Sequence, residues 1–493
     1  MTTHAPLTHA PTRPDSSRAA ARSRVLALAV LCAGMLMIIL DGSIVTVALP
    51  AIQDDLGFTP AGLTWTVNAY LIAFGGLLLL AGRLGDLVGR KKVFVAGLAL
   101  FTAASLLCAV ATGQGVLIAA RFLQGIGGAM ASAVSLGMIV TLFPEPRERG
   151  RAIAAFSFTG AAGASIGQVL GGVLTEALNW HWIFLINLPL GLAAALLAVR
   201  VLDADHGPGL RAGADALGAV LITAALMLGI YTIVGTGEHG WASARTLGLG
   251  ALSALLLAAF LVRQARAARP LLPLRMFRSR NVTGANAVQV LTISGMFGFQ
   301  VLVALYLQNV LGYGAAATGL AMLPAAVAIG AVSLLLSARL NARFGERNVL
   351  LAGLALLVAA LGLLARLPAG ADYVPHLLPT MLLIGGGGLV LSALTALGMS
   401  GAGAADAGTA SGLFNTTQQV GAALGVAVLT TLAGSRTSAL AAAGHPAADA
   451  LTGGFRLAFA VAAGLLVVAF VLTAVVLRKP APAAADRPVA PVA

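Results

Sequence analysis

The stretch G-R-L-G-D-L-V-G-R-K-K-V-F at residues 82–94 connects two long apolar runs, and a weaker copy, A-R-L-N-A-R-F-G-E-R-N-V-L, lies at residues 338–350. At a constant offset of 256 residues, four positions are identical: Arg83 and Arg339, Leu84 and Leu340, Gly89 and Gly345, Val93 and Val349. This similarity, at corresponding connections between apolar runs, predicts that the chain consists of two parallel, repeated halves.

Apolar residues dominate the chain. Of its 493 residues 59% are hydrophobic and only 10% are charged, whereas soluble domains carry about 25% charged residues. This predicts an all-α integral membrane protein, because helices satisfy their own backbone polar groups in lipid. Fourteen runs have about the length that spans a bilayer. They are 25–49, 63–81, 93–111, 115–142, 152–176, 183–202, 216–235, 247–262, 285–307, 316–337, 349–367, 377–398, 408–433 and 457–477.

The net charge of +13 does not indicate nucleic acid binding, because the charges lie between the apolar runs and not in one patch. If the N-terminus lies inside, the inner segments hold 25 Lys and Arg residues and the outer segments hold four. Basic residues favour the cytoplasmic side, so both ends of the chain are predicted to be cytoplasmic. The four outer basic residues are Arg245, Arg366, Arg436 and Arg456.

The repeat offset corresponds to eight apolar runs and not six, which predicts two six-helix bundles with two helices inserted between them. The expected regions are a disordered cytoplasmic tail (1–24), an N-terminal bundle (25–202), the inserted helices with a basic inner loop (203–280), a C-terminal bundle (281–477) and a second cytoplasmic tail (478–493).

Asp41 is the acid that falls well inside an apolar run, where an ionised carboxylate costs at least ~2.5 kcal/mol. Such a group can take and release a proton, or it can stay paired as a structural charge. Arg121 is the embedded base, either functional or a structural anchor. At ~1.5 Å rise per residue the two lie at similar depths, which allows pairing without establishing contact.

Glycines recur where close packing or a tight turn is expected. In the connection at 82–94, the glycines allow a tight turn. Two interpretations of this connection stay open: a conformational latch through Asp86, or an ordinary basic loop. The residues of this expected latch are Gly82, Arg83, Gly85, Asp86, Gly89 and Arg90. In the run 152–176, one face carries Gly163, Gly167 and Gly171, which we expect to pack closely at the seam between the bundles.

Polar side chains inside the runs are candidates for a substrate cavity, and each is equally suited to bonding a neighbouring helix. They are Asn68, Tyr70, Gln124, Gln168, Gln289, Gln300 and Asn415. Cys32 and Cys108 are interpreted as small core residues. The sequence contains no nucleotide-binding loop, metal-ligand spacing or catalytic triad spacing, so an ion gradient is the expected energy source and no cofactor or metal is expected.

Several stretches resemble the major facilitator superfamily, and within it the fourteen-helix drug:proton antiporter family. The 82–92 connection is similar to its signature loop, A-A-R-F-L-Q-G-I-G-G-A at 119–129 to its fourth-helix motif, and L-D-G-S-I-V-T-V-A-L-P at 40–50 to its first-helix motif. W-H-W-I-F-L-I-N-L-P-L-G at 180–191 is also similar to a family segment. The resemblance implies proton coupling by Arg121 and Asp41. Gln168 departs from it, since the family's fifth-helix motif has proline there.

The resemblance implies that the protein is a proton-coupled efflux transporter and not an enzyme. It implies export of amphipathic drugs or antibiotics, cationic ones among them, by alternating access. Its expected partners are protons, a small-molecule substrate and the lipid bilayer of a bacterial inner membrane. No nucleic acid partner is expected, and the protein is expected to be a monomer. Three alternatives stay open: a dedicated exporter of one endogenous metabolite, a proton-coupled uptake symporter, and a membrane receptor or scaffold that transports nothing.

Overall fold

A computed structural model describes residues 14–203, 205, 207, 209, 215–267, 270–271, 274–399 and 407–477. Throughout these residues the regular structure is helical. The helices are α1 (Pro14–Leu56), α2 (Pro60–Leu63), α3 (Trp65–Val88), α4 (Arg90–Ala109), α5 (Gln114–Leu142), α6 (Pro146–Ala177), α7 (Trp182–Leu185), α8 (Asn187–Val201), α9 (Ala216–His239), α10 (Ala244–Arg266), η2 (Leu274–Arg278), α11 (Arg280–Asn309), α12 (Ala315–Ala331), η3 (Val332–Leu336), α13 (Ser337–Phe344), α14 (Glu346–Leu364), η4 (Tyr373–Leu377), α15 (Leu378–Leu383), α16 (Gly386–Met399), α17 (Ala407–Ala442) and α18 (Ala447–Val476).

Each of the fourteen predicted apolar runs falls on one of these helices or on consecutive short ones. Twelve spans in the described chain are long and apolar enough to cross a membrane. A thirteenth, α3, is bent by 49° between Trp65–Leu78 and Leu80–Val88. Helix α6 is not among the spans counted in the described residues. The chain is therefore a multi-pass membrane protein, and the count of fourteen spans stays a prediction.

The first helix is longer than the sequence predicted. It begins at Pro14, so residues 14–24 are helical and do not belong to a disordered tail. Proline is well suited to the first turn of a helix, and the Ala and Arg residues that follow favour helix formation. The rest of that predicted tail and the tail at 478–493 lie outside the described residues.

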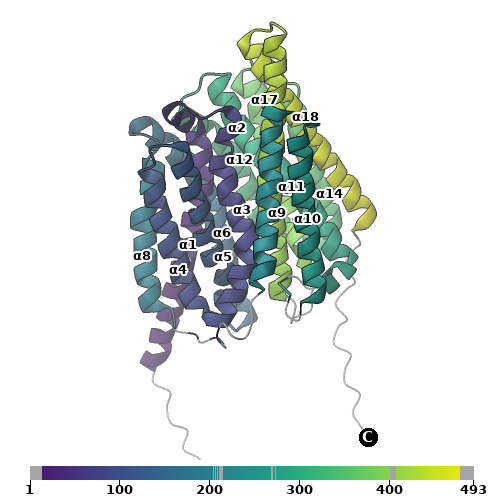
Figure 1. Ribbon diagram of the computed structural model, residues 1–493. Helices are drawn as coiled ribbons and strands as arrows, with labels where there is room; N and C mark the ends of the chain where they lie inside the picture. The colour runs from purple at the N-terminus through teal and green to yellow at the C-terminus, as the bar shows by residue number, and fades with distance from the viewer. Residues whose placement is uncertain are drawn as a thin grey trace, which may run out of the picture.

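Two hydrophobic cores organise the helices. One is built mostly from residues 27–234 and the other from residues 285–477. Figure 1 shows the purple and blue helices of the first group beside the green and yellow helices of the second, with α1 beginning and α18 ending at the same end of the molecule. Helices α6 and α12 pack against each other across the two groups, and so do α3 and α17.

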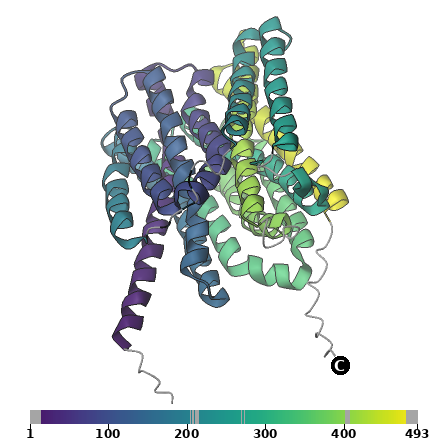
Figure 2. The same ribbon diagram turned by 60° about the horizontal axis from the view of Figure 1, so that its bottom comes forward.

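Helices α9 and α10 lie between the two groups in sequence and stand side by side over their junction (Figures 1 and 2). Helix α9 packs against α3 and α17, one helix from each group, while α10 packs mainly against α9. The outer surface of α10 exposes leucines such as Leu247, Leu255 and Leu261. A helix with such a surface faces lipid.

The duplicated sequence forms two similar joints. Helices α3 and α4 meet at Gly89, which has φ 106°, and helices α13 and α14 meet at Gly345, which has φ 78°. Residues with a side chain rarely adopt such angles, so glycine is required at both equivalent positions. The repeat read from the sequence is thus a repeat of backbone conformation.

Close packing of α4 on α5 depends on Gly97 and Gly127. A Cβ atom on Gly127 would lie 2.5 Å from the backbone nitrogen of Phe101, and one on Gly97 would lie 2.7 Å from the backbone nitrogen of Ala131. Backbone atoms cannot move aside as a flexible side chain can. The two helices can therefore approach this closely only while both positions lack a side chain.

We expect Gly127→Val to separate α4 from α5 and to lower the thermal stability of the detergent-purified protein, because overpacking typically costs about 1–3 kcal/mol. Gly464→Val is the matched control, since a Cβ at Gly464 in α18 meets nothing within 4 Å. Equal melting temperatures for the two variants would contradict this account of the packing.

Candidate functional site

A buried ion pair lies inside the first group of helices. Asp41 in the middle of α1 and Arg121 in α5 are both almost completely buried, and Arg121 Nη1 lies 2.5 Å from Asp41 Oδ2. Arg121 also donates from Nε to the carbonyl oxygen of Thr66 at 2.8 Å. The two residues that the sequence singled out are thus in direct contact.

Two amides complete the shell around the Asp41 carboxylate. Gln124 Nε2 donates to Asp41 Oδ1 at 3.1 Å, and Asn187 Nδ2 donates to the same oxygen at 2.8 Å. Gln124 also accepts from Arg121 Nη1 through its Oε1 at 2.8 Å, so it bonds both members of the pair. With three donors aimed at its oxygens, the carboxylate is well accommodated in its charged form.

A second layer fixes the Gln124 amide. Its Nε2 donates to Ser105 Oγ at 2.7 Å, and its Oε1 accepts from the thiol of Cys108 at 3.2 Å. Ser105 and Cys108 lie one turn apart on α4. The polar network therefore joins α1, α4, α5 and α8, and a change at Asp41 reaches all four helices.

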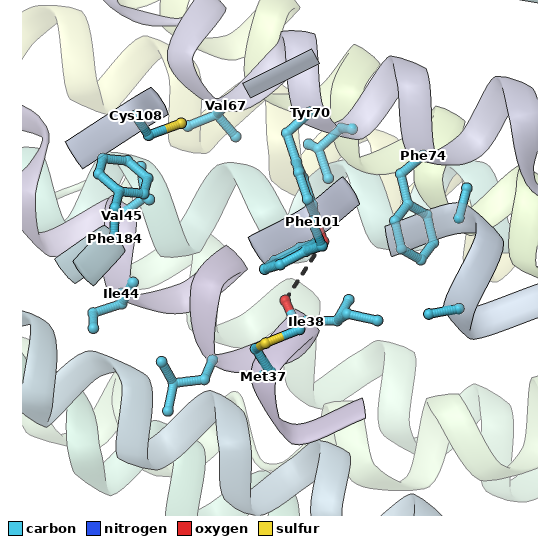
Figure 3. Packing of buried hydrophobic residues seen from close by; sticks show 14 of the residues in the cluster. Met37, Ile38, Ile44, Val45, Val67, Tyr70, Phe74, Phe101, Cys108 and Phe184 are labelled. Carbon is cyan, nitrogen blue, oxygen red and sulfur yellow. Dashed lines mark hydrogen bonds between the residues drawn. The ribbon is translucent and has the colours of Figure 1, made fainter. Parts of the chain in front are cut away.

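Aromatic and aliphatic side chains enclose this network. Arg121 Cζ lies 4.4 Å from the ring centroid of Tyr70 and 5.8 Å from that of Phe184. Figure 3 shows Tyr70 among packed residues such as Phe101, with its hydroxyl group directed to the carbonyl oxygen of Ile38 at 3.5 Å. Low-polarity surroundings strengthen the ion pair and make an unpaired charge there costly.

The expected latch connection forms an ion pair at the α3–α4 joint. Asp86 Oδ1 lies 3.1 Å from Arg90 Nη2, and Arg90 Nη1 donates to the carbonyl oxygen of Gly137 in α5 at 3.0 Å. A Cβ on Gly85 would lie 2.4 Å from Val134 Cγ1, so α3 and α5 pack closely at this position. Gly82 has more room, and Arg83 is half-buried.

An acid that sequence reasoning missed also binds this joint. The Asp205 carboxylate, from the segment after α8, accepts from the backbone N–H groups of Arg90 at 2.7 Å and Lys91 at 3.1 Å. Lys91 Nζ in turn donates to the carbonyl oxygen of Val199 at 2.8 Å. Although partial burial acts to raise the pKa of Asp205, these backbone hydrogen bonds outweigh it and hold that pKa below its ordinary value.

The glycine face of α6 packs differently from what we expected. Cβ atoms on Gly167 and Gly171 would lie 2.8 Å and 2.7 Å from the carbonyl oxygens of Leu40 and Ile44, and Gly163 faces the same helix. These three glycines therefore contact α1 within the first group of helices. The residues of α6 at the seam with the second group of helices lie on a different side of α6 from these three glycines.

At that seam, Gly172 and Gln168 of α6 face α12. A Cβ on Gly172 would lie 2.4 Å from the carbonyl oxygen of Ala315, and one on Gly319 would lie 2.4 Å from the carbonyl oxygen of Gln168. Gly172 on α6 and Gly319 on α12 thus allow these two helices to approach closely. One face of α6 packs against α1, and the other packs at the junction with the second group. The spacing of residues in the sequence does not show which face meets which neighbour.

The predicted cavity residues fall into two sets. Tyr70 and Gln124 belong to the network around Asp41. Asn68, Gln168 and Gln289 are buried, and each has at least one side-chain polar atom without a hydrogen-bond partner. Unsatisfied buried amides are costly, so these three are the better candidates for contact with a polar substrate. Gln300 and Asn415 are half-buried.

Among the site residues that the sequence analysis did not identify, Asn187 had the clearest signal in the sequence. It is a polar residue followed by Leu-Pro within the apolar run 183–202. Ser105 and Cys108 carry a weaker signal, because hydroxyl and thiol groups are common in helix interiors. Asp205 had no signal, since nothing in its spacing shows that it reaches the start of α4.

Comparison with known proteins agrees with this architecture. The Major Facilitator Superfamily profile matches residues 31–426. The chain is 41% identical over 417 residues to the cephamycin export protein CmcT of Amycolatopsis lactamdurans (84% of this chain, 85% of the relative) and 37% identical over 452 residues to the puromycin resistance protein pur8 of Streptomyces alboniger (90% of each). The crystal structure of an auto-inhibited POT family peptide transporter has the same fold, with a TM-score of 0.67, 17% identity and coverage of 93% of this chain and 98% of that one.

The fold and the buried site are those of a helical, multi-pass membrane protein. The chain belongs to the Major Facilitator Superfamily, since the family profile covers most of its length. Its similar proteins include antibiotic exporters and resistance proteins.

We expect Asp41→Asn and Arg121→Gln each to destabilise the protein by about 3–5 kcal/mol, because each leaves a buried charge without its partner. The double variant should recover part of that loss, since it removes both charges. Thermal unfolding of the purified variants tests this. A double variant that loses the sum of the two single effects would contradict an energetically coupled pair.

We expect Asp205→Ala to lower the melting temperature at pH 7. Because the pKa of Asp205 is depressed in the folded protein, its stabilisation is present above the ordinary aspartate pKa of about 3.9 and is lost as the pH falls through the lower, folded-state pKa. The gap between the variant and the wild type should therefore shrink below about pH 4. Asp203→Ala, which removes an exposed neighbouring acid, is the control and should leave the melting temperature at pH 7 near that of the wild type.

Proposed function

We propose that this protein is a proton-coupled efflux transporter of a bacterial inner membrane, which exports amphipathic small molecules, antibiotics among them, by alternating access. The observation that carries the proposal is the Asp41–Arg121 pair, a titratable carboxylate held on an arginine inside the helix bundle. Its relatives CmcT and pur8, named for cephamycin export and puromycin resistance, support the direction of transport and the substrate class.

The proton step follows from the contacts of the carboxylate. A proton transferred from water to Asp41 neutralises it, so that Arg121 loses its counter-charge. The amides of Gln124 and Asn187, which donate to Asp41 Oδ1, then face a poorer acceptor. Protonation thereby weakens the contacts among α1, α5 and α8 together, and release of the proton restores them.

The contacts between the two helix groups support alternating access. Gln308 Nε2 in α11 donates to the carbonyl oxygen of Val47 in α1 at 3.0 Å, and the backbone N–H of Ala316 in α12 donates to Glu176 Oε2 in α6 at 2.9 Å. Gln308 and Glu176 lie at the ends of α11 and α6, Ala316 lies at the start of α12, and Val47 lies in the second half of α1. The predicted topology assigns these parts of the helices to the outer side. We take this as a state closed at the outer end. Weakening the Asp41 network, on the same helix as Val47, would favour opening there.

Export of a single endogenous compound is the second candidate. It is favoured by the name of CmcT, which specifies cephamycin export. A panel of drugs that includes puromycin and a cephamycin, tested in a pump-deficient host with and without the gene, separates the two. Protection against many unrelated compounds supports the broad exporter, and protection against one supports the dedicated exporter. An uptake symporter would move substrate in the opposite direction in everted vesicles.

We expect Asp41→Asn to abolish substrate-dependent proton release from acidified everted vesicles, since asparagine cannot exchange a proton. Asp54→Asn, an exposed acid at the far end of the same helix, should behave like the wild type. A pH-sensitive dye in the vesicle lumen measures the flux, and the amount of each variant in the membrane is determined in parallel. Undiminished proton-driven transport by well-expressed Asp41→Asn would remove this carboxylate from the mechanism.

A further inference from the structure

A cavity of about 300 Å³ lies between the first group of helices and the inserted helices, at the end of the molecule where α2 is seen in Figure 1. The proposed transport mechanism does not use it. Its walls come from the α2–α3 region and from the facing ends of α9 and α10. The side chains that define its chemistry are those of Trp65, Tyr231, His239, Arg245 and Thr246.

Arg245 supplies the charge of this cavity. Its Nη2 donates to the hydroxyl oxygen of Tyr231 at 2.6 Å, and its Nη1 lies 2.7 Å from Nε2 of His239. Among the described residues that line the cavity, none is Asp or Glu. Within this described lining, the guanidinium group is held in place by the Tyr231 hydroxyl group and the His239 ring.

The two ring nitrogens of His239 have different partners. Its Nδ1 lies 3.1 Å from the carbonyl oxygen of Gly235, and its Nε2 lies toward Arg245, a geometry that suits donation from Nδ1 and acceptance at Nε2. The hydroxyl group of Tyr231, which accepts from Arg245, keeps its own proton as a donor. The arrangement fixes the guanidinium and leaves donors available to a ligand.

Aromatic rings form an apolar wall beside this charge. The rings of Trp65 and Tyr231 have centroids 6.0 Å apart at an interplanar angle of 46°, and Arg245 Cζ lies 5.8 Å from the Tyr231 centroid. Tyr231 is 42% exposed, so this wall remains accessible. A rigid positive fork next to exposed rings suits a ligand with an anionic group on an apolar body.

A second cavity at the same end differs in this respect. It is about 600 Å³ in volume and is lined by Arg436 and Arg456, but also by Asp449. An acid in the wall provides a counter-charge within the protein, so the need for an external anion is weaker. The described lining of the cavity around Arg245 contains no such acid.

We propose that the cavity between α3, α9 and α10 binds an organic anion, with Arg245 holding a carboxylate or phosphate group and Trp65 and Tyr231 contacting its apolar part. This site is separate from the Asp41 network and does not depend on the proposed transport function. It gives the inserted helices a role in ligand binding. The same chemistry is offered by a soluble aromatic anion and by the headgroup of an anionic lipid.

The binding test uses the full-length protein with 1-naphthyl phosphate as the soluble probe, measured by isothermal titration calorimetry in detergent. Arg245→Gln should weaken binding about ten-fold or more, since a hydrogen-bonded charge is lost. Arg245→Lys should retain part of the affinity. Arg366→Gln is the matched control, because it removes the same charge at another position assigned to the outer side.

The lipid source is tested in parallel by native mass spectrometry after reconstitution in nanodiscs of phosphatidylglycerol or phosphatidylcholine. Retention of phosphatidylglycerol that is lost in Arg245→Gln but kept in Arg366→Gln identifies a lipid headgroup, whereas selective binding of the soluble probe alone identifies a solute. Equal behaviour of the two variants with both probes, in protein with wild-type melting temperature, would overturn the proposal. Its failure would leave proton-coupled flux through Asp41 unaffected.

Discussion

The ion pair of Asp41 with Arg121 constrains the packing of the first helix group. Either charge alone would be costly in an interior without water, so the two side chains must lie within hydrogen-bonding distance of each other. Their remaining donors and acceptors must also have hydrogen-bond partners. The carboxylate side chain is short, and it can meet its partners only where helix backbones approach closely. A Cβ on Gly125 would lie 2.4 Å from the carbonyl oxygen of Tyr70, and Gly167 lies against Leu40 beside the acid. Glycine packing and charge pairing are two parts of one arrangement.

The two halves have similar backbone conformations at their joints, but the side chains at equivalent positions differ. Gly89 and Gly345 adopt equivalent positive φ angles at equivalent joints, which reflects the repeated sequence. Position 86 holds an acid, whereas the corresponding position 342 holds alanine, so the ion pair at the joint occurs in the first copy alone. Asp205 strengthens this asymmetry by binding the start of α4 from the segment that leads to the inserted helices. The first half therefore carries both the buried pair and the reinforced joint.

The inserted helices take different positions relative to the bundles. Helix α9 lies between α3 and α17 and so touches both helix groups, while α10 packs mainly on α9. At one end of these two helices, Arg245 donates a hydrogen bond to Tyr231 beside a cavity. At the other end, Arg263 Nε lies 3.0 Å from Asp215 Oδ1. Polar contacts at both ends and lipid-facing leucines between them are the pattern of a helical hairpin anchored at the membrane boundaries.

The sequence by itself determined that the chain is helical and spans a membrane, because long runs without charge can satisfy their backbone groups only as helices in lipid. It also identified Asp41 and Arg121, since an ionisable residue in such a run is conspicuous wherever it points. Tertiary structure alone decided the partners. That Asn187 reaches Asp41, that Asp205 binds the α3–α4 joint and that Gly163 faces α1 and not the seam depend on how the helices are rotated and how close they lie. Helical spacing specifies a face but not the neighbour that the face meets, because several neighbours can bury the same apolar or small-residue surface.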